Sequence, residues 1–398
     1  MRTGWRNGLV MSAAGLAMAL FHGASTAGQA GPLSGDRVAQ LNQALARHQR
    51  PLHRDPRTGY LVSVLDALTV PAESQLLVFS KTGVQRAYTS PHNPRAIYFD
   101  QSVAVAYVPG APLLEVAADD PEQGIVFYTL DQSAAAPSFA RQTSCLTCHV
   151  SPGTLGVPGL IARSHVVGDD GNVRPRTEAH DVNHQTRHPD RWGGWFVTSE
   201  GAPPPYQQLA HLGNVTFSGK GNTSNQVFVD WLNSSPEGRG YLSDASDIAG
   251  LLLFDHQVYA INLITKLHVE ARAGSAEAPR LASELADYLL FTGEAGPLSP
   301  LTPRPGFAAN LESKFPKDRR GRSLAQLNMD SRLLRFPCSY MIYADAFDAL
   351  PAPIKGMVYR RIIERLSAPE LRATRTELDD RQAVLEILRD TKSDFPAR

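Results

Sequence analysis

The sequence predicts an α+β fold in which a β-rich part precedes a helical part. Short β-branched or aromatic runs, separated by clusters of Pro, Gly, Asn and Asp, fill residues 60–131. After Tyr241 the apolar residues recur at helical spacing. We therefore expect a β-rich domain at residues 31–135, a loop-rich segment at 136–240 and a mainly helical region at 241–398, with two lobes around the loop-rich segment.

The N-terminus has the three parts of a secretory signal peptide. Positive charge comes from Arg2 and Arg6. Residues 9–20 are apolar and small residues follow at 23–27, so a signal peptide is predicted at residues 1–30. The apolar run is short for a membrane anchor. We expect an exported, periplasmic protein with no membrane span after signal cleavage.

The charge balance limits the classes of partner. Acidic and basic side chains number 39 each, which gives a formal net charge of +0. A neutral field does not hold nucleic acid or an anionic membrane surface, so neither is expected as a general partner.

The elements of the N-terminal half are predicted in chain order. A surface helix is expected at 34–48, where Val38, Leu41 and Leu45 are apolar and the opposite face is polar. A hairpin that turns at Asp170-Gly171 is expected within 161–174. The predicted strands are residues 60–64, 75–79, 95–99, 103–107 and 125–129.

The C-terminal part is predicted to contain four helices joined by loops. The predicted helices are residues 243–271, 281–291, 354–366 and 377–389. Residues 296–306 are rich in proline and read as a linker or surface loop. Capping-box spacing occurs from Ser367 to Glu370, before the last helix.

The strongest local pattern is Cys145-Leu146-Thr147-Cys148-His149. Two cysteines three positions apart, followed at once by a histidine, form the C-x-x-C-H pattern of covalent haem attachment. In a helical turn both sulfurs lie on one side, where they can reach the vinyl groups on one porphyrin edge. The imidazole is then placed to reach the iron from one face as the proximal ligand. One covalent haem c, with its iron, is therefore predicted.

Three other uses of the cysteine pair stay open at this point: a thioredoxin-like redox pair, half of a zinc site and a structural disulfide. A redox pair normally lies at a strand-to-helix junction, whereas residues 132–137 look like a loop. A zinc site needs two more ligands, for which His180 with His184, or His184 with His188, are available. The third cysteine, Cys338, has apolar neighbours and is predicted to be buried.

The motif at residues 145–149 in an exported chain resembles the c-type cytochrome superfamily. The resemblance implies haem c on both cysteines, with the histidine as axial ligand. Over a wider range the chain is similar to large exported bacterial proteins with a cytochrome c-type motif, in residues 78–82, 191–198 and 337–350. That wider resemblance implies no particular substrate.

The distal ligand of the iron is sought among methionines and histidines. After the signal peptide the methionines are Met329, Met341 and Met357, all far beyond the motif. The histidines closer to the motif are His165, His180, His184, His188 and His211. We expect His211 or His184, because both have glycine- or aromatic-rich surroundings where backbone can approach a flat cofactor closely. An open distal site would instead permit small-molecule chemistry.

Several other side chains have both a functional and a structural interpretation. Arg191 and Arg163 could pair with haem propionates, although surface charge is the simpler interpretation of both. Trp192 and Trp195 are predicted to pack in the core, with haem contact as the alternative. His256, in an apolar helical stretch, is predicted to be a core residue rather than a ligand.

These expectations favour a periplasmic electron carrier that passes single electrons between redox partner proteins, for which a covalently fixed haem needs only a partly exposed edge. The alternatives are a haem enzyme, peroxidase- or oxidoreductase-like, that acts on a small redox substrate, and a haem-based sensor. Chain length favours an enzyme, whereas the lack of a second C-x-x-C-H motif weighs against the two-haem peroxidases.

Overall fold

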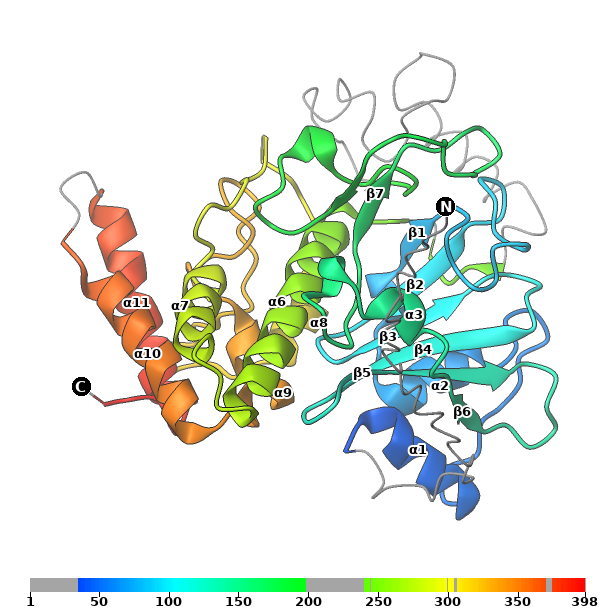
Figure 1. The fold of residues 1–398 in the computed structure, drawn as a ribbon, viewed down its shortest axis with the longest axis horizontal. Coiled ribbons are helices and arrows are strands. Elements are labelled where there is room, and N and C mark those ends of the chain that lie inside the picture. The colour runs from blue at the N-terminus through cyan, green and yellow to red at the C-terminus, as the bar shows by residue number, and fades with distance from the viewer. Residues whose placement is uncertain are drawn as a thin grey trace, which may run out of the picture. The chain divides into compact units, whose positions relative to one another are not determined.

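A computed structural model describes residues 35–197, 240–243, 245–298, 300–303, 306–369 and 374–397 (Figure 1). The predicted signal peptide at 1–30 lies outside the described residues, and so does His211. The architecture is α+β, as predicted: an antiparallel sheet occupies the N-terminal region and helices occupy the C-terminal region.

Six antiparallel strands form the main sheet, and their order across the sheet is their order in the chain. They are β1 (Leu76–Val78), β2 (Arg95–Phe99), β3 (Val103–Tyr107), β4 (Leu113–Asp120), β5 (Gly124–Asp131) and β6 (Phe139–Arg141). The strands predicted at 75–79, 95–99, 103–107 and 125–129 are confirmed. β4 was not predicted, because Glu115, Asp119 and Asp120 make it look like an exposed segment; the last two are in fact buried.

The strand predicted at residues 60–64 is wrong, because this stretch opens helix α2 (Leu61–Leu68). Val62 and Val64 favour a strand locally, but the longer pattern of buried residues is helical. Leu61, Val64, Leu65 and Leu68 lie at the three- and four-residue spacing of one helix face, and all are buried.

The two faces of the sheet belong to two different cores. One face is covered by α2 and by α1 (Arg37–Ala46), which confirms the helix predicted at 34–48. The opposite face packs against α6 (Ile248–Arg272) in the larger core. The helices are arranged outward from the sheet in the order α6, α7, α10 and α11 (Figure 1).

The four helices predicted in the C-terminal part are confirmed. They are α6, α7 (Ala278–Leu289), α10 (Ala352–Ser367) and α11 (Arg375–Thr391), and two shorter helices are α8 (Phe307–Ser313) and α9 (Asp345–Asp348). α6 begins only at Ile248, where the Asp247 carboxylate accepts a hydrogen bond from the N–H of Ala249. The capping box before α11 is formed by Thr374 and Glu377; Glu370, expected in that role, lies outside the described residues.

α6 is also long and apolar enough to meet the criteria for a membrane span. In its most apolar stretch, 94% of the residues are buried inside the protein. A helix in the core of a protein can meet the same criteria without crossing a membrane.

Short elements lie before the sheet, between the sheet and α6, and after α8. The hairpin predicted within 161–174 is present: Gly171 occupies its turn with φ near +80°, and Val167 pairs with Val173. The short elements are α3 (Leu146–His149), β7 (Arg163–His165), β8 (Ala179–Asp181), and the 3₁₀ turns η1 (Ala72–Ser74), η2 (Pro152–Thr154), η3 (His188–Asp190) and η5 (Tyr340–Tyr343).

Candidate haem site

The C-x-x-C-H stretch forms a single helical turn that follows β6. The carbonyl oxygen of Cys145 accepts hydrogen bonds from the N–H groups of Cys148, at 3.2 Å, and His149, at 3.0 Å. Residues three apart on such a turn share one side, so both sulfurs face the same way. Both cysteines are free thiols; Cys145 is half-buried and Cys148 is exposed.

The imidazole of His149 is oriented by one backbone carbonyl. Its Nδ1 lies 2.8 Å from the carbonyl oxygen of Gly159. Because a carbonyl oxygen only accepts, Nδ1 carries the proton and Nε2 of the neutral ring keeps its lone pair. Among the residues that the structure describes, Nε2 makes no hydrogen bond. A histidine that binds a metal through Nε2 has this arrangement.

Gly159 is itself held in place from both sides. Its N–H donates to the carbonyl oxygen of His149 at 3.0 Å, and the next residue, Leu160, is bound by Asn262 of α6. A Cβ at position 159 would collide with the amide oxygen of Asn262, so a glycine is required there. The packing of α6 thus determines where the carbonyl that orients His149 lies.

Burial lowers the pKa of His149, and the positive charges of Arg95 and Arg163 lower it further, against the hydrogen bond to Gly159, which raises it. The net shift favours the neutral imidazole, which is the form that binds a metal. Burial also raises the pKa of the Cys145 thiol, and the Glu115 carboxylate adds to that rise.

His149 contacts one end of a row of paired residues that crosses strands β5, β4 and β3. The His149 ring packs on Phe127 of β5, with ring centroids 4.5 Å apart. Across the neighbouring strands Phe127 pairs with Ala117, and Ala117 pairs with Ala104. The half-buried apolar side chains packed against this core include Ala104, Ala106, Cys145, Leu146, Leu155 and Leu160. His149 therefore packs on an apolar part of the sheet, with Phe127 in contact and Ala117 paired to Phe127.

Arg95, at the start of β2, is a functional candidate that the sequence analysis did not identify. Its guanidinium lies against Gly83, and its Nε is buried without a hydrogen-bond partner in the described part of the chain. Burial lowers its pKa, and the negative charge of Glu115 partly offsets that shift. No carboxylate among the described residues forms an ion pair with it. The unpartnered Nε of this half-buried arginine can donate to an anionic group placed beside it.

Of the two residues expected as distal ligands, only His184 lies in the described part of the chain, and its contacts are with core residues. His184 is 2% exposed, and its Nδ1 is hydrogen-bonded to Nδ1 of His256 at 2.8 Å. Its ring stacks on Tyr288, with centroids 4.1 Å apart. His256 in turn binds the Ser339 hydroxyl at 2.6 Å, which confirms it as a core residue. His211 lies outside the described residues, so its role stays a prediction.

The prediction that Arg191 is a surface charge is wrong, because the residue is 1% exposed. Its guanidinium lies 3.5 Å from the Asp255 carboxylate and donates to the carbonyl oxygens of His184 and Thr186. These bonds occupy the N–H groups of Arg191 that would otherwise donate to a haem propionate. Arg163 is half-exposed and pairs with Asp181 at 2.6 Å.

The core predictions for the tryptophans and the third cysteine are confirmed. Trp192 and Trp195 are buried, and their indole N–H groups donate to the Asp255 carboxylate and the Arg163 carbonyl oxygen. Cys338 is fully buried, which raises the pKa of its thiol to about 12.

The histidines available for a zinc site lie apart from the cysteine pair in their contacts. Within the described ranges, no group of three or more His, Cys, Asp or Glu side chains is placed so that it could hold a metal ion. His180 is exposed on β8, whereas Nε2 of His188 lies 3.0 Å from the carbonyl oxygen of Gly296.

No protein-family model, no curated protein and no solved structure matches the chain. The interpretation of the site therefore rests on its own residues and geometry.

Proposed function

We propose that the protein is a periplasmic c-type cytochrome that holds one haem covalently on Cys145 and Cys148, with His149 as the proximal iron ligand. In this proposal it transfers single electrons between redox partners. The observation that carries the proposal is the hydrogen bond from Nδ1 of His149, in the turn that carries both free thiols, to the carbonyl oxygen of Gly159. That bond leaves Nε2 as the metal-binding nitrogen.

The residues around the turn fit a haem group. The porphyrin is flat and apolar, and the short side chains of Ala117 and Ala104 continue the row across the sheet that begins at Phe127, which contacts His149. Haem also carries carboxylates, and the unpartnered Nε of the half-buried Arg95 is available to one of them. We assign Arg95 to a propionate in preference to Arg191, whose donors are used within the core.

The exposure of the turn favours electron transfer. Cys148 is exposed, and Val150, directly after the motif, is 41% exposed although it is apolar. A haem attached there has an edge near the surface, where a partner protein can approach it. When bound, the haem supplies the one-electron chemistry, while the chain orients the ligand and sets the polarity around it.

The test is the ligation and redox behaviour of the protein purified after co-expression with haem-maturation machinery. We expect a low-spin, six-coordinate ferric spectrum that ignores cyanide and carbon monoxide, and a redox titration that fits a one-electron step. A high-spin spectrum with rapid binding of both ligands would reject the electron carrier and support a haem enzyme or sensor.

A further inference from the structure

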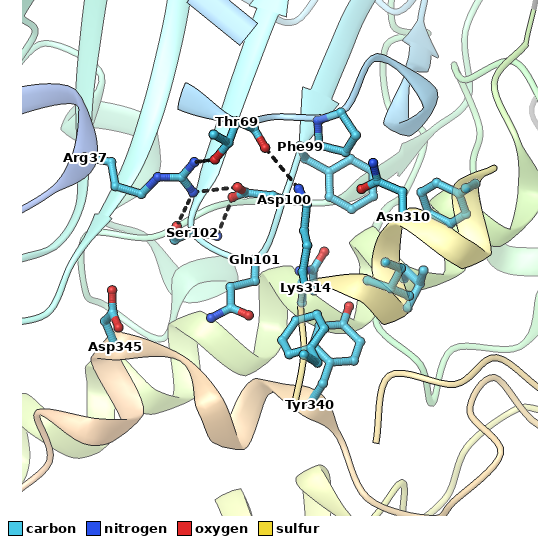
Figure 2. Close-up of a pocket in the computed structure, with 16 residues that line it drawn as sticks. Arg37, Thr69, Phe99, Asp100, Gln101, Ser102, Asn310, Lys314, Tyr340 and Asp345 are labelled. Atoms are coloured by element: carbon cyan, nitrogen blue, oxygen red, sulfur yellow. Dashed lines mark hydrogen bonds and ion pairs between the residues drawn. The ribbon is translucent and has the colours of Figure 1, made fainter. Parts of the chain in front are cut away.

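A cavity of about 420 Å³ lies between β2, α6 and α8, away from the haem motif (Figure 2). Its floor is aromatic: Phe99, Phe307, Phe315 and Tyr340 line it, and all four side chains are buried. None of the motif residues lines it. The volume and the apolar floor are those of a small-molecule site.

One pair of charges at the mouth of the cavity is already neutralised. Arg37 forms an ion pair with Asp100 at 2.5 Å and also donates to the hydroxyls of Ser102 and Thr69 (Figure 2). Asp100 accepts, in addition, the N–H groups of Ser102 and Val103. Neither member of this pair has its charge open to a ligand.

Lys314 is the cation at the mouth that has no ion pair within the described structure. Its Nζ donates to the carbonyl oxygen of Thr69 at 3.0 Å, and the other two N–H groups have no protein partner there. The exposed carboxylate of Asp345 lies on the far side of Gln101 from Lys314 (Figure 2). An anionic group can therefore approach Lys314 from the cavity.

The cavity wall also holds polar atoms without partners. The Tyr340 hydroxyl, Oε1 of Gln257 and Oδ1 of Asn310 are buried with no hydrogen-bond partner among the described residues. Tyr340 is fully buried, and a buried hydroxyl without a partner is destabilising. These three atoms are closed to solvent, so Lys314 is a donor at the mouth that stays open to a ligand, above the aromatic floor.

We propose that this cavity binds a small monocarboxylate with an aromatic body. The carboxylate is held by the ammonium of Lys314, and the aromatic body packs on Phe99, Phe307 and Phe315. The site does not depend on the haem, although Phe99 and Phe127, which contacts His149, belong to one row across β2 to β5.

Calorimetric titration of the full purified chain with phenylacetate tests the proposal. Phenylacetamide is the matched neutral probe, and acetate is the probe without an aromatic body. We expect phenylacetate to bind at one site, phenylacetamide about tenfold or more weakly, and acetate not measurably, since a charge-assisted hydrogen bond is worth about 1.5 kcal/mol or more.

Two variants separate the cavity from the rest of the surface. Lys314→Met keeps the apolar stem and should lose about tenfold in phenylacetate affinity with little change for phenylacetamide. Lys317→Met is the control, because Lys317 pairs with Glu312 at 2.9 Å and does not line the cavity. The proposal is overturned if no probe binds, if both aromatic probes bind equally, or if Lys314→Met leaves phenylacetate affinity unchanged.

Discussion

Asn262, in the middle of α6, binds both backbone groups of Leu160. Its Oδ1 accepts the N–H at 3.0 Å, and its Nδ2 donates to the carbonyl oxygen at 2.8 Å. Leu160 follows Gly159, whose carbonyl orients His149. A core helix thus holds the loop that determines the tautomer of the proposed iron ligand.

Asn262→Leu should lower the free energy of unfolding by about 2 kcal/mol, because two buried backbone groups lose their partners. It should also change the axial-ligand signature of the haem spectrum. Asn42→Leu is the matched control, since Asn42 binds both backbone groups of Phe139 in the same way. Urea unfolding and absorption spectra of both variants are the measurements; a stability loss in both with a spectral change in neither would contradict the role of Asn262.

Arg95→Gln should lower the midpoint potential of the haem. Reduction adds negative charge, which a half-buried guanidinium nearby favours and a neutral amide does not. Arg141→Gln, an exposed arginine on β6, is the control and should leave the potential close to the wild-type value. Both variants are compared by redox titration at equal haem content. Equal potentials in the two variants would remove Arg95 from the haem site.

Burial raises the pKa of Asp119 to about 7, and the negative charges of Asp120, Asp345 and Asp36 add to the rise. Because the folded pKa exceeds the unfolded one, the protonated form is favoured in the fold. Protonated Asp119 therefore stabilises the fold at low pH, and this stabilisation is lost as the pH rises toward about 7. Asp119→Asn should remove roughly 2 to 3 kcal/mol of pH dependence between about pH 5 and pH 8.

The measurement for Asp119 is urea unfolding of the wild type and the variant at both pH values. Asp66→Asn, at an exposed position on α2, is the control and should keep the wild-type dependence. An Asp119→Asn protein with that same dependence would refute the assignment.

His184→Leu should destabilise the fold by about 2 kcal/mol or more, because His256 loses its partner in a buried stack. The spin state of the iron should stay unchanged, since His184 is committed to the core. The exposed His180→Ala is the control for both readouts. Conversion to a high-spin spectrum in His184→Leu would show that this histidine reaches the iron after all.

The sequence predicted those elements whose local pattern agrees with their burial. β2, β3 and β5 are β-branched or aromatic runs between turn residues, and all three are strands of the main sheet. The stretch at Tyr60 was misjudged because Val62 and Val64 favour a strand over five residues, whereas the helical pattern needs the eight residues up to Leu68 to become visible.

The candidate site was predictable only in part. Cys145, Cys148 and His149 stand out because they are adjacent in sequence, and the helical turn that they were expected to form is present. The support for them comes from positions that the sequence does not connect with the motif, namely the carbonyl of Gly159 and the guanidinium of Arg95. Arg191 was misjudged because its partner Asp255 lies on α6, far along the chain.

The most direct test is the mass of the denatured protein after extraction with acidified acetone, which removes haem that is not covalently bound. The wild type and Cys338→Ala, which alters the buried third cysteine, should stay coloured and be heavier by one haem. The double variant Cys145→Ala/Cys148→Ala should be colourless and have the mass of the polypeptide alone. A colourless wild-type protein with only its polypeptide mass, after expression with haem-maturation machinery, would contradict the account.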